Sequence, residues 1–524
     1  VLLRIPAPDA SAAIDAIGAA GDVTREAYSA SSLTALDAAV ETATAAVADV
    51  RSTQAELDSA AAAIDAALAA LEEIGYVPLD DYRIAVLAGQ APELPATLEL
   101  LTISEARLAE DVAWEDVEAE DFDEPYAVVE VHGVAGATDV VLHVEVVPAG
   151  LAYFVDAGAA VETTENGPVL GSPVYDVVSP LAALRNPVVD AAFDGDADEP
   201  WGLATAIGDG GVTARAELET LADKDLTAWE APDGTLAYRF WLPAGSYEVT
   251  TGHSVTGDAA ASLVTTVTHE GVDTSADAVV LDADVPTGAA TVAFTTYRDA
   301  VVTVTVEGEG GPAMLSWLGI VDTTEPEAPG AATAAPGAGV LSTDNGWDTG
   351  LADGDYTLMW DMWWGQGATT VAFYEDDRLV GAVRLDDATP ASQHAEIDLA
   401  GRVNGTYTYV AVARNAHGVT TSEELVVEVT DAAPGQGVLS HDNHDRDGDY
   451  TVTFNLWWGT NGTTYRLYED GVLVDEQELT GSTPDAQTAS TALTGRAVGR
   501  HTYVAELVNA AGTTATKPIT VTVR

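Results

Sequence analysis

The chain has 524 residues and no cysteine, and its 85 Asp and Glu residues against 20 Lys and Arg residues give a formal net charge of −65. This length allows about three to five domains, each large enough to bury a core without disulfide or metal staples. The lack of cysteine excludes thiol nucleophiles, Cys-ligated zinc and iron–sulfur clusters. The acidic charge makes nucleic acid and anionic membranes poor partners, and no run approaches the ~20 apolar residues of a membrane helix.

The first residue is Val1 rather than Met, and residues 1–8 look like the last strand of a domain that comes before. We therefore expect the chain to be the C-terminal part of a longer protein, with any signal peptide upstream or removed.

Residues 9–76 are rich in alanine, and apolar residues recur at spacings of three and four, as in Leu57, Ile64 and Leu68. This periodicity predicts helices, and the breaks between the runs predict a three-helix bundle. Ser52 is expected to cap the third helix.

Tyr28 and Ser29 followed by Leu33 and Leu36, with Thr-Gln-Ala-Glu-Leu-Asp at residues 53–58, resemble a FIVAR-type module. In that family the module is a spacer or a weak sugar-associated unit on cell-surface glycosidases and adhesins.

The periodicity changes to two in residues 77–148, where residues 128–134 and 140–146 alternate as strands do. Together with Gly89 and a central Trp114, these strands resemble a bacterial immunoglobulin-like module. The resemblance implies a rigid spacer.

A longer β region covers residues 149–322, with a clear hairpin formed by residues 238–242 and 247–251. The hairpin resembles those of malectin-like or galactose-binding jelly rolls, and so do Leu184-Arg185-Asn186 with Asp190 and the pair Trp201-Gly202. This family resemblance implies carbohydrate binding.

Within the hairpin, alternation places Arg239 and Trp241 on the face opposite Tyr238, Phe240 and Leu242. We expect the Arg239 face to be exposed and to offer a clamp for sugar hydroxyls. Trp229 and Tyr297 are further candidates in loops, with packing in the core as the alternative.

Residues 323–336 are too rich in Pro and Ala to form a core and are predicted to be a linker. Residues 337–430 and 434–524 then repeat one pattern without a slip, for example Trp-Trp-Gly at residues 363–365 and again at 457–459. Two tandem sandwiches follow from this repeat. They resemble the immunoglobulin-like or fibronectin-like domains beside the catalytic barrels of bacterial chitinases.

The paired tryptophans are the sharpest feature of the repeats. If the strand alternation continues through them, Trp364 and Trp458 lie in the cores while Trp363 and Trp457 point outward. An exposed indole at a strand end suits stacking on the apolar face of a sugar ring. The alternatives are that the outer tryptophans pack on the next module, or that a bulge turns both inward.

Asp442, Asp445, Asp447 and Asp449 form an oxygen-rich loop that is a candidate for structural calcium. An EF-hand beginning at Asp445 fails, because Leu456 stands where a bidentate Glu is needed. The alternative is a series of Asx turns leading into a strand. No cofactor is required by any motif.

Catalytic motifs of other kinds are missing from the sequence, which has no P-loop, no GxSxG elbow and no HExxH. Glycoside hydrolysis asks only for two facing carboxylates. We expect each segment to close a core of its own, which leaves no shared cavity for such a pair.

The predicted fold is mainly β and multidomain: a three-helix bundle, an Ig-like sandwich, a jelly roll and two Ig/FnIII-like sandwiches. Taken together, the resemblances imply accessory modules of a secreted, actinobacterial-like glycoside hydrolase, with a polysaccharide and an upstream catalytic domain as partners. The rival hypothesis is a structural cell-surface protein, such as an adhesin stalk or filament subunit, without glycan specificity.

Overall fold

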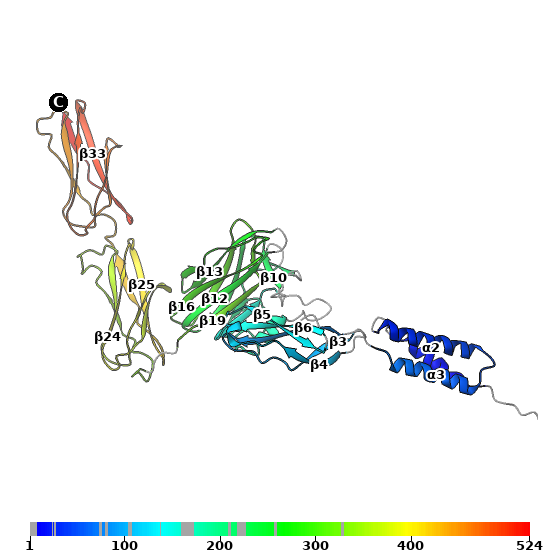
Figure 1. Ribbon diagram of the computed structural model, residues 1–524. Coiled ribbons are helices and arrows are strands. Elements are labelled where there is room, and N and C mark those ends of the chain that lie inside the picture. The colour runs from blue at the N-terminus through cyan, green and yellow to red at the C-terminus, as the bar shows by residue number, and fades with distance from the viewer. Residues whose placement is uncertain are drawn as a thin grey trace, which may run out of the picture.

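The computed structural model describes residues 8–23, 25, 28–72, 76–78, 82–102, 107–136, 138–158, 172–207, 211–216, 227–255, 259–325 and 330–524. The predicted end of a preceding domain, at residues 1–8, lies outside this part except for Pro8. The chain forms modules in succession, with the helices at one end and the two repeats at the other (Figure 1). The mainly β, multidomain fold is confirmed.

The helical module consists of α1 (Ser11–Gly21), α2 (Ala30–Ala48) and α3 (Gln54–Ala69). Its core is formed mostly by alanine, with Leu36 and Ile64 as its large members. Thr53, and not the expected Ser52, caps α3, because its side chain and that of Glu56 bond reciprocally to backbone N–H groups. None of the described helices is both long enough and apolar enough to cross a membrane.

The Ig-like module follows as a folded sheet in the strand order β1-β3-β4-β5-β6-β2. Its strands are β1 (Tyr76–Pro78), β2 (Tyr82–Leu87), β3 (Thr97–Thr102), β4 (Arg107–Trp114), β5 (Val128–Ala135) and β6 (Thr138–Val147). β2 pairs with β6 in parallel, which brings the two ends of the module together at one edge.

The jelly roll packs one sheet, β14-β13-β17-β11-β8, against a second, β16-β12-β19-β7, with β18-β10-β9 beside them. Its elements are β7 (Leu151–Asp156), α4 (Pro173–Val178), β8 (Trp201–Leu203), β9 (Thr213–Ala216), β10 (Thr227–Ala231), β11 (Thr235–Leu242), β12 (Gly245–Ser254), β13 (Ala261–His269), β14 (Val272–Ser275), β15 (Val279–Leu281), β16 (Thr287–Thr296), β17 (Ala300–Gly308), β18 (Ala313–Leu315) and β19 (Trp317–Asp322). Tyr238 and Phe240 on β11 lie in the core between the two large sheets.

Repeat 1 and repeat 2 have the same topology, a three-stranded sheet against a five-stranded one. Repeat 1 contains β20 (Val340–Thr343), β21 (Tyr356–Met362), β22 (Thr370–Glu375), β23 (Arg378–Arg384), β24 (Gln393–Leu399), β25 (Gly405–Asn415), β26 (Gly418–Thr421) and β27 (Leu425–Val429). Repeat 2 contains β28 (Val438–His441), β29 (Tyr450–Leu456), β30 (Thr464–Glu469), β31 (Val472–Glu478), β32 (Gln487–Leu493), β33 (Gly499–Asn509), β34 (Gly512–Ala515) and β35 (Ile519–Val523). Each core holds a pair of tyrosines whose hydroxyls bond at 2.7 Å.

Each module buries a core of its own, and a further apolar cluster lies at the border between the Ig-like module and the jelly roll. One apolar cluster there includes Val147 of β6, Phe154 of β7 and Trp317 of β19. Tyr126 of the Ig-like module lies against the Trp317 ring, with 4.8 Å between centroids. Because β6 leads into β7 through three residues, the two modules are joined as one packed unit.

A second apolar cluster joins the jelly roll to repeat 1. Ala372, Tyr374 and Val412 of the outer face of repeat 1 are buried against Tyr297 of the jelly roll. Glu270, at the tip of the β13–β14 hairpin, has a fully buried side chain beside them. Apolar packing therefore continues across two of the module borders that the sequence indicates.

Candidate functional site

The two repeats carry four exposed tryptophans at corresponding strand ends. The exposed fractions are 69% for Trp363, 75% for Trp364, 69% for Trp457 and 55% for Trp458. Large apolar side chains are rarely left in water to this extent without a partner. These indoles form flat apolar surfaces that a ligand can cover.

The expected burial of Trp364 and Trp458 is wrong, because the alternation of buried and exposed residues ends at the residue directly before each tryptophan pair. Residues Tyr450–Leu456 alternate between buried and half-buried, as predicted, but β29 ends at Leu456 and β21 ends at Met362. The glycine after each pair has a positive φ, 147° in repeat 1 and 136° in repeat 2. A chain that turns at this point no longer alternates between faces, so both tryptophans point outward.

Arg239 and Trp241 lie on the outer face of β11, with Arg239 exposed and Trp241 half-buried. The Arg185 guanidinium lies 5.4 Å from the centroid of the Trp241 ring and donates to Glu199 at 3.1 Å. Arg239 lies at the same distance from the Phe193 ring. This edge therefore combines two aromatic rings with two cations, and Arg185 is a member of it that alternation along β11 could not reveal.

Trp229 is not a loop residue, because it lies on β10 with 1% of its surface exposed. Its Nε1 donates to Asp190 Oδ2 at 2.9 Å, and the Tyr238 hydroxyl donates to both Asp190 oxygens at 3.0 Å. Backbone N–H groups of Gly158 and Ala191 complete the shell. Burial raises the pKa of Asp190 to about 6, against the opposing effect of these donors. Trp229 therefore serves the core and is not available to a ligand.

Tyr297 is half-buried in the cluster between the jelly roll and repeat 1. Its backbone N–H donates to Glu270 at 3.3 Å. The aromatic ring of Tyr297 therefore packs between the jelly roll and repeat 1.

The four aspartates of the acidic loop each accept a hydrogen bond from a backbone N–H. Asp442 accepts from Thr451 at 2.7 Å and Asp449 from Gly495 at 2.7 Å, while Asp445 and Asp447 accept from the second residue after each. The Thr451 bond holds the pKa of Asp442 below its ordinary value. The bonds of Asp445 and Asp447 are Asx turns, whereas those of Asp442 and Asp449 reach backbone groups farther along the chain.

We expect the melting temperature of the whole chain to stay within about 1 °C when EDTA is replaced by excess Ca²⁺, because the loop carboxylates are already bonded to backbone donors. Thermal unfolding followed by calorimetry measures this. A rise of several degrees that disappears in Asp445→Asn would instead assign calcium to the loop.

Among the described residues, Glu469, Asp470 and His501 bring possible metal-ligand atoms within 4.8 Å of one another. Both nitrogens of His501 already face acceptors, Nδ1 at 2.7 Å from Glu469 and Nε2 at 2.8 Å from the Ala497 carbonyl. Arg496 lies 3.3 Å from the second Glu469 oxygen. Glu469 and His501 are therefore already engaged with each other and with neighbouring protein groups.

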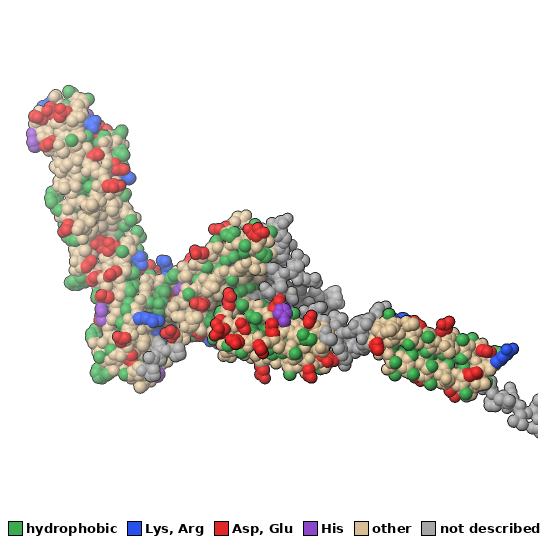
Figure 2. Space-filling view, viewed as in Figure 1, with side chains coloured by type: hydrophobic (Ala, Val, Ile, Leu, Met, Phe, Trp, Pro, Cys, Tyr) green, Lys and Arg blue, Asp and Glu red, His purple; other side chains and the backbone are tan. Residues whose placement is uncertain are grey.

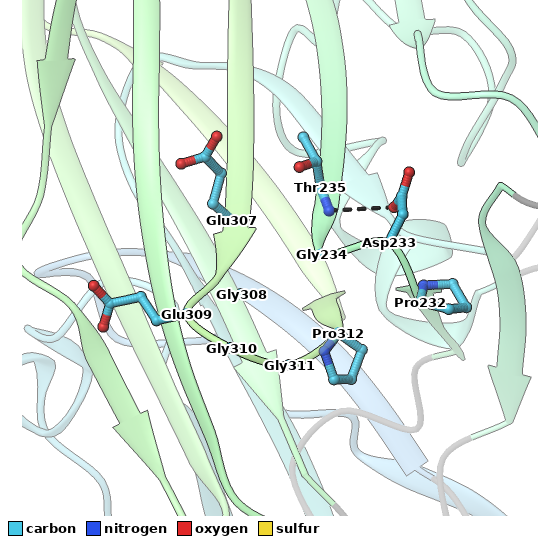
Figure 3. A pocket seen from close by; sticks show the side chains of 10 residues that line it. All are labelled: Pro232, Asp233, Gly234, Thr235, Glu307, Gly308, Glu309, Gly310, Gly311 and Pro312. Atoms are coloured by element: carbon cyan, nitrogen blue, oxygen red, sulfur yellow. Dashed lines mark hydrogen bonds between the residues drawn. The ribbon is translucent and has the colours of Figure 1, made fainter.

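An open hollow at one end of the jelly roll is lined by residues 232–235 and 307–312. Figure 3 shows the carboxylates of Asp233, Glu307 and Glu309 pointing in separate directions around it. Glu309 accepts a bond from the Ser262 hydroxyl at 2.7 Å. The residues that line the hollow include no aromatic side chain.

Residues 438–524, which form repeat 2, match the family model described as Chitinase A, N-terminal domain. A search of the curated proteins finds no match.

Several solved structures are similar to parts of the chain. The fibronectin(III)-like modules of Clostridium thermocellum CbhA share 15% identity, over 35% of this chain and 93% of that one, with a TM-score of 0.14. The N-terminal CBM22-1-CBM22-2 tandem domain of Paenibacillus barcinonensis Xyn10C shares 12% sequence identity, and the match covers 44% of this chain and 93% of that one, with a TM-score of 0.19. A Bacteroides uniformis beta-glucuronidase shares 13% sequence identity, and the match covers 46% of this chain and 28% of that one, with a TM-score of 0.20.

Proposed function

We propose that this chain is a non-catalytic accessory region that holds a polysaccharide close to a catalytic domain of the same extracellular protein. The observation that carries the proposal is the exposure of the tryptophan pairs on repeat 1 and repeat 2. The match of repeat 2 to the family model described as Chitinase A, N-terminal domain, supports it.

Each indole pair offers a rigid apolar plane at the end of a strand, so little conformational entropy is lost when a sugar ring stacks on it. The Arg239 and Trp241 edge of the jelly roll adds a second kind of surface, with guanidinium donors for sugar hydroxyls. Weak sites on linked modules raise the effective concentration of an attached enzyme at an insoluble glycan.

Acidic side chains lie on every module in the face that Figure 2 shows. With a net charge of −65, the surface repels anionic polymers and tolerates uncharged ones. This charge favours a neutral glycan as the partner.

Retention of the whole chain on insoluble chitin, arabinan and galactan tests the proposal. We expect retention on at least one of them, weakened about tenfold when Trp363→Ala and Trp457→Ala are combined, because two stacking planes are lost. Val498→Ala, which removes an exposed apolar side chain without a ring, is the matched control and should bind as the unaltered chain does.

The absence of retention on any of these glycans would contradict the proposal and favour the structural stalk. Release of chromogen from a panel of aryl glycosides by the chain alone would contradict its non-catalytic role.

A further inference from the structure

The loop that opens repeat 1 is four residues longer than its counterpart in repeat 2. It covers residues 344–355 between β20 and β21, against residues 442–449 between β28 and β29. The longer loop contains Trp347, which is 88% exposed and is the most exposed tryptophan of the described residues. Repeat 2 has no tryptophan in the corresponding loop.

This loop of repeat 1 reaches the tryptophan pair of repeat 2. A β-carbon at Gly350 would lie 3.5 Å from Cζ2 of Trp458. Trp347 is three residues from Gly350, and three residues span at most about 11 Å. The loop that carries Trp347 therefore lies beside the strand end that carries Trp457 and Trp458.

Hydrogen bonds hold this junction in place. The Ala352 carbonyl accepts from the Asp431 N–H at 2.8 Å, and the Asp431 carboxylate accepts from the Ala352 N–H at 3.0 Å. On the side of repeat 2, the Thr460 hydroxyl donates to the Asp431 carbonyl, and the Asn509 amide donates to the Ala432 carbonyl at 2.9 Å. The short connection is bonded to both repeats, so the distance between their aromatic surfaces is restrained.

The corresponding loop of repeat 2 lies at the end of the chain that the structure describes, where the Arg446 carbonyl accepts from the N–H of Arg524. The extra residues and their tryptophan occur in the loop of repeat 1 that lies against Trp458 of repeat 2. The difference between two otherwise matching repeats points to a role at the junction.

We propose that Trp347 of repeat 1 and Trp457 with Trp458 of repeat 2 form one composite site for an uncharged hexopyranose chain, which neither repeat forms alone. The inference rests on the proposed function and assigns its site. Indoles on both sides of a restrained junction stack on separate rings of one oligosaccharide. The exposed Asp348, next to Trp347, supplies a carboxylate that accepts from sugar hydroxyls. The acidic surface excludes polyanionic chains.

A double-mutant cycle in the whole chain tests the composite site, with Trp347→Ala, Trp458→Ala and the pair titrated with chitohexaose and galactohexaose by calorimetry. For a shared site we expect each single variant to bind the hexasaccharide about tenfold more weakly. The double variant should bind about a hundredfold more weakly, because the two indoles stack on separate rings of one ligand and their contributions add. Val498→Ala, which removes an exposed apolar side chain without a ring, is the matched control and should bind the hexasaccharides as the unaltered chain does.

Unchanged affinity for the hexasaccharides in either Trp347→Ala or Trp458→Ala would overturn the composite site and leave the proposed function intact. Disaccharides that bind as tightly as the hexasaccharides would overturn it as well, since so short a ligand cannot reach both sides. Failure of the unaltered chain to bind any glycan, soluble or insoluble, would instead contradict the proposed function itself.

Discussion

Replacing Asp190 by alanine should lower the free energy of unfolding of the jelly roll by about 4 kcal/mol, which corresponds to a fall in its melting temperature of about 10 °C. Asp190 is 2% exposed and accepts from two backbone N–H groups, the Trp229 indole and the Tyr238 hydroxyl. Without the carboxylate these buried donors have no partner. Calorimetry of the whole chain measures the change.

Asp190→Asn should cost nearly as much as Asp190→Ala. Each Asp190 oxygen accepts from a backbone N–H, Oδ1 from Ala191 and Oδ2 from Gly158. An asparagine amide would therefore face an N–H donor in either orientation. Asp198→Ala, at an exposed position of the same region, is the control and should leave the melting temperature unchanged. A loss below about 1 kcal/mol in Asp190→Asn would contradict this account.

The same residue gives the jelly roll a defined dependence on pH. The folded chain binds a proton at Asp190 up to a pKa of about 6, whereas the ordinary value is 3.8. Between these values the folded state holds more protons than the unfolded state at this site, so the contribution of Asp190 to stability is largest below pH 4 and is lost as pH rises through 6. The contribution is about 3 kcal/mol, and the difference between the stability curves of the unaltered chain and Asp190→Ala isolates it from the other acids.

Replacing Tyr374 by phenylalanine should loosen repeat 1 from the jelly roll. The Tyr374 hydroxyl donates to the buried Glu270 carboxylate at 2.7 Å, and burial raises the pKa of Glu270. The Arg298 guanidinium lies 4.4 Å from the Tyr374 ring centroid and 3.1 Å from Asp377. Losing the hydroxyl costs about 2 kcal/mol, since a buried charged acceptor loses its shortest donor. We expect repeat 1 to melt about 10 °C lower in calorimetry of the whole chain.

Repeat 2 supplies the control for this prediction. Tyr468 occupies the matching position and donates to Glu506, on a face that no described module covers. Tyr468→Phe should therefore change neither the melting profile nor the maximum dimension in solution scattering. Equal effects of the two substitutions would show that the Tyr374 bond does not hold the modules together.

Local patterns in the sequence predicted the strands well, because alternation is a property of each strand alone. Tyr450 to Leu456 alternate in the structure as they do in the sequence. The prediction was wrong for Trp364 and Trp458, where a turn at the following glycine ends the alternation. The repeat itself signalled the tryptophan pairs, and the extra loop residues around Trp347 were visible only as a difference in length.

Contacts between modules could not be predicted, since they join residues that no local pattern relates. Glu270 follows a histidine and resembles an incomplete metal motif in the sequence, yet its carboxylate bonds to Tyr374, 104 residues away. A comparison of the repeats contains a partial signal. Ala372 and Val412 of the docked face correspond to Arg466 and Glu506 in repeat 2, where no described module covers the surface.

The alanine core of the helical module has a mechanical consequence. Its helices bury six alanines but few large side chains, whereas the β-rich modules bury rings and branched chains in each core and at two of their borders. Tension along the chain therefore opens this bundle before the rest. The unfolded stretch of residues 11–69 then extends to about 200 Å. This added length lowers the force that is transmitted between the two ends of the chain.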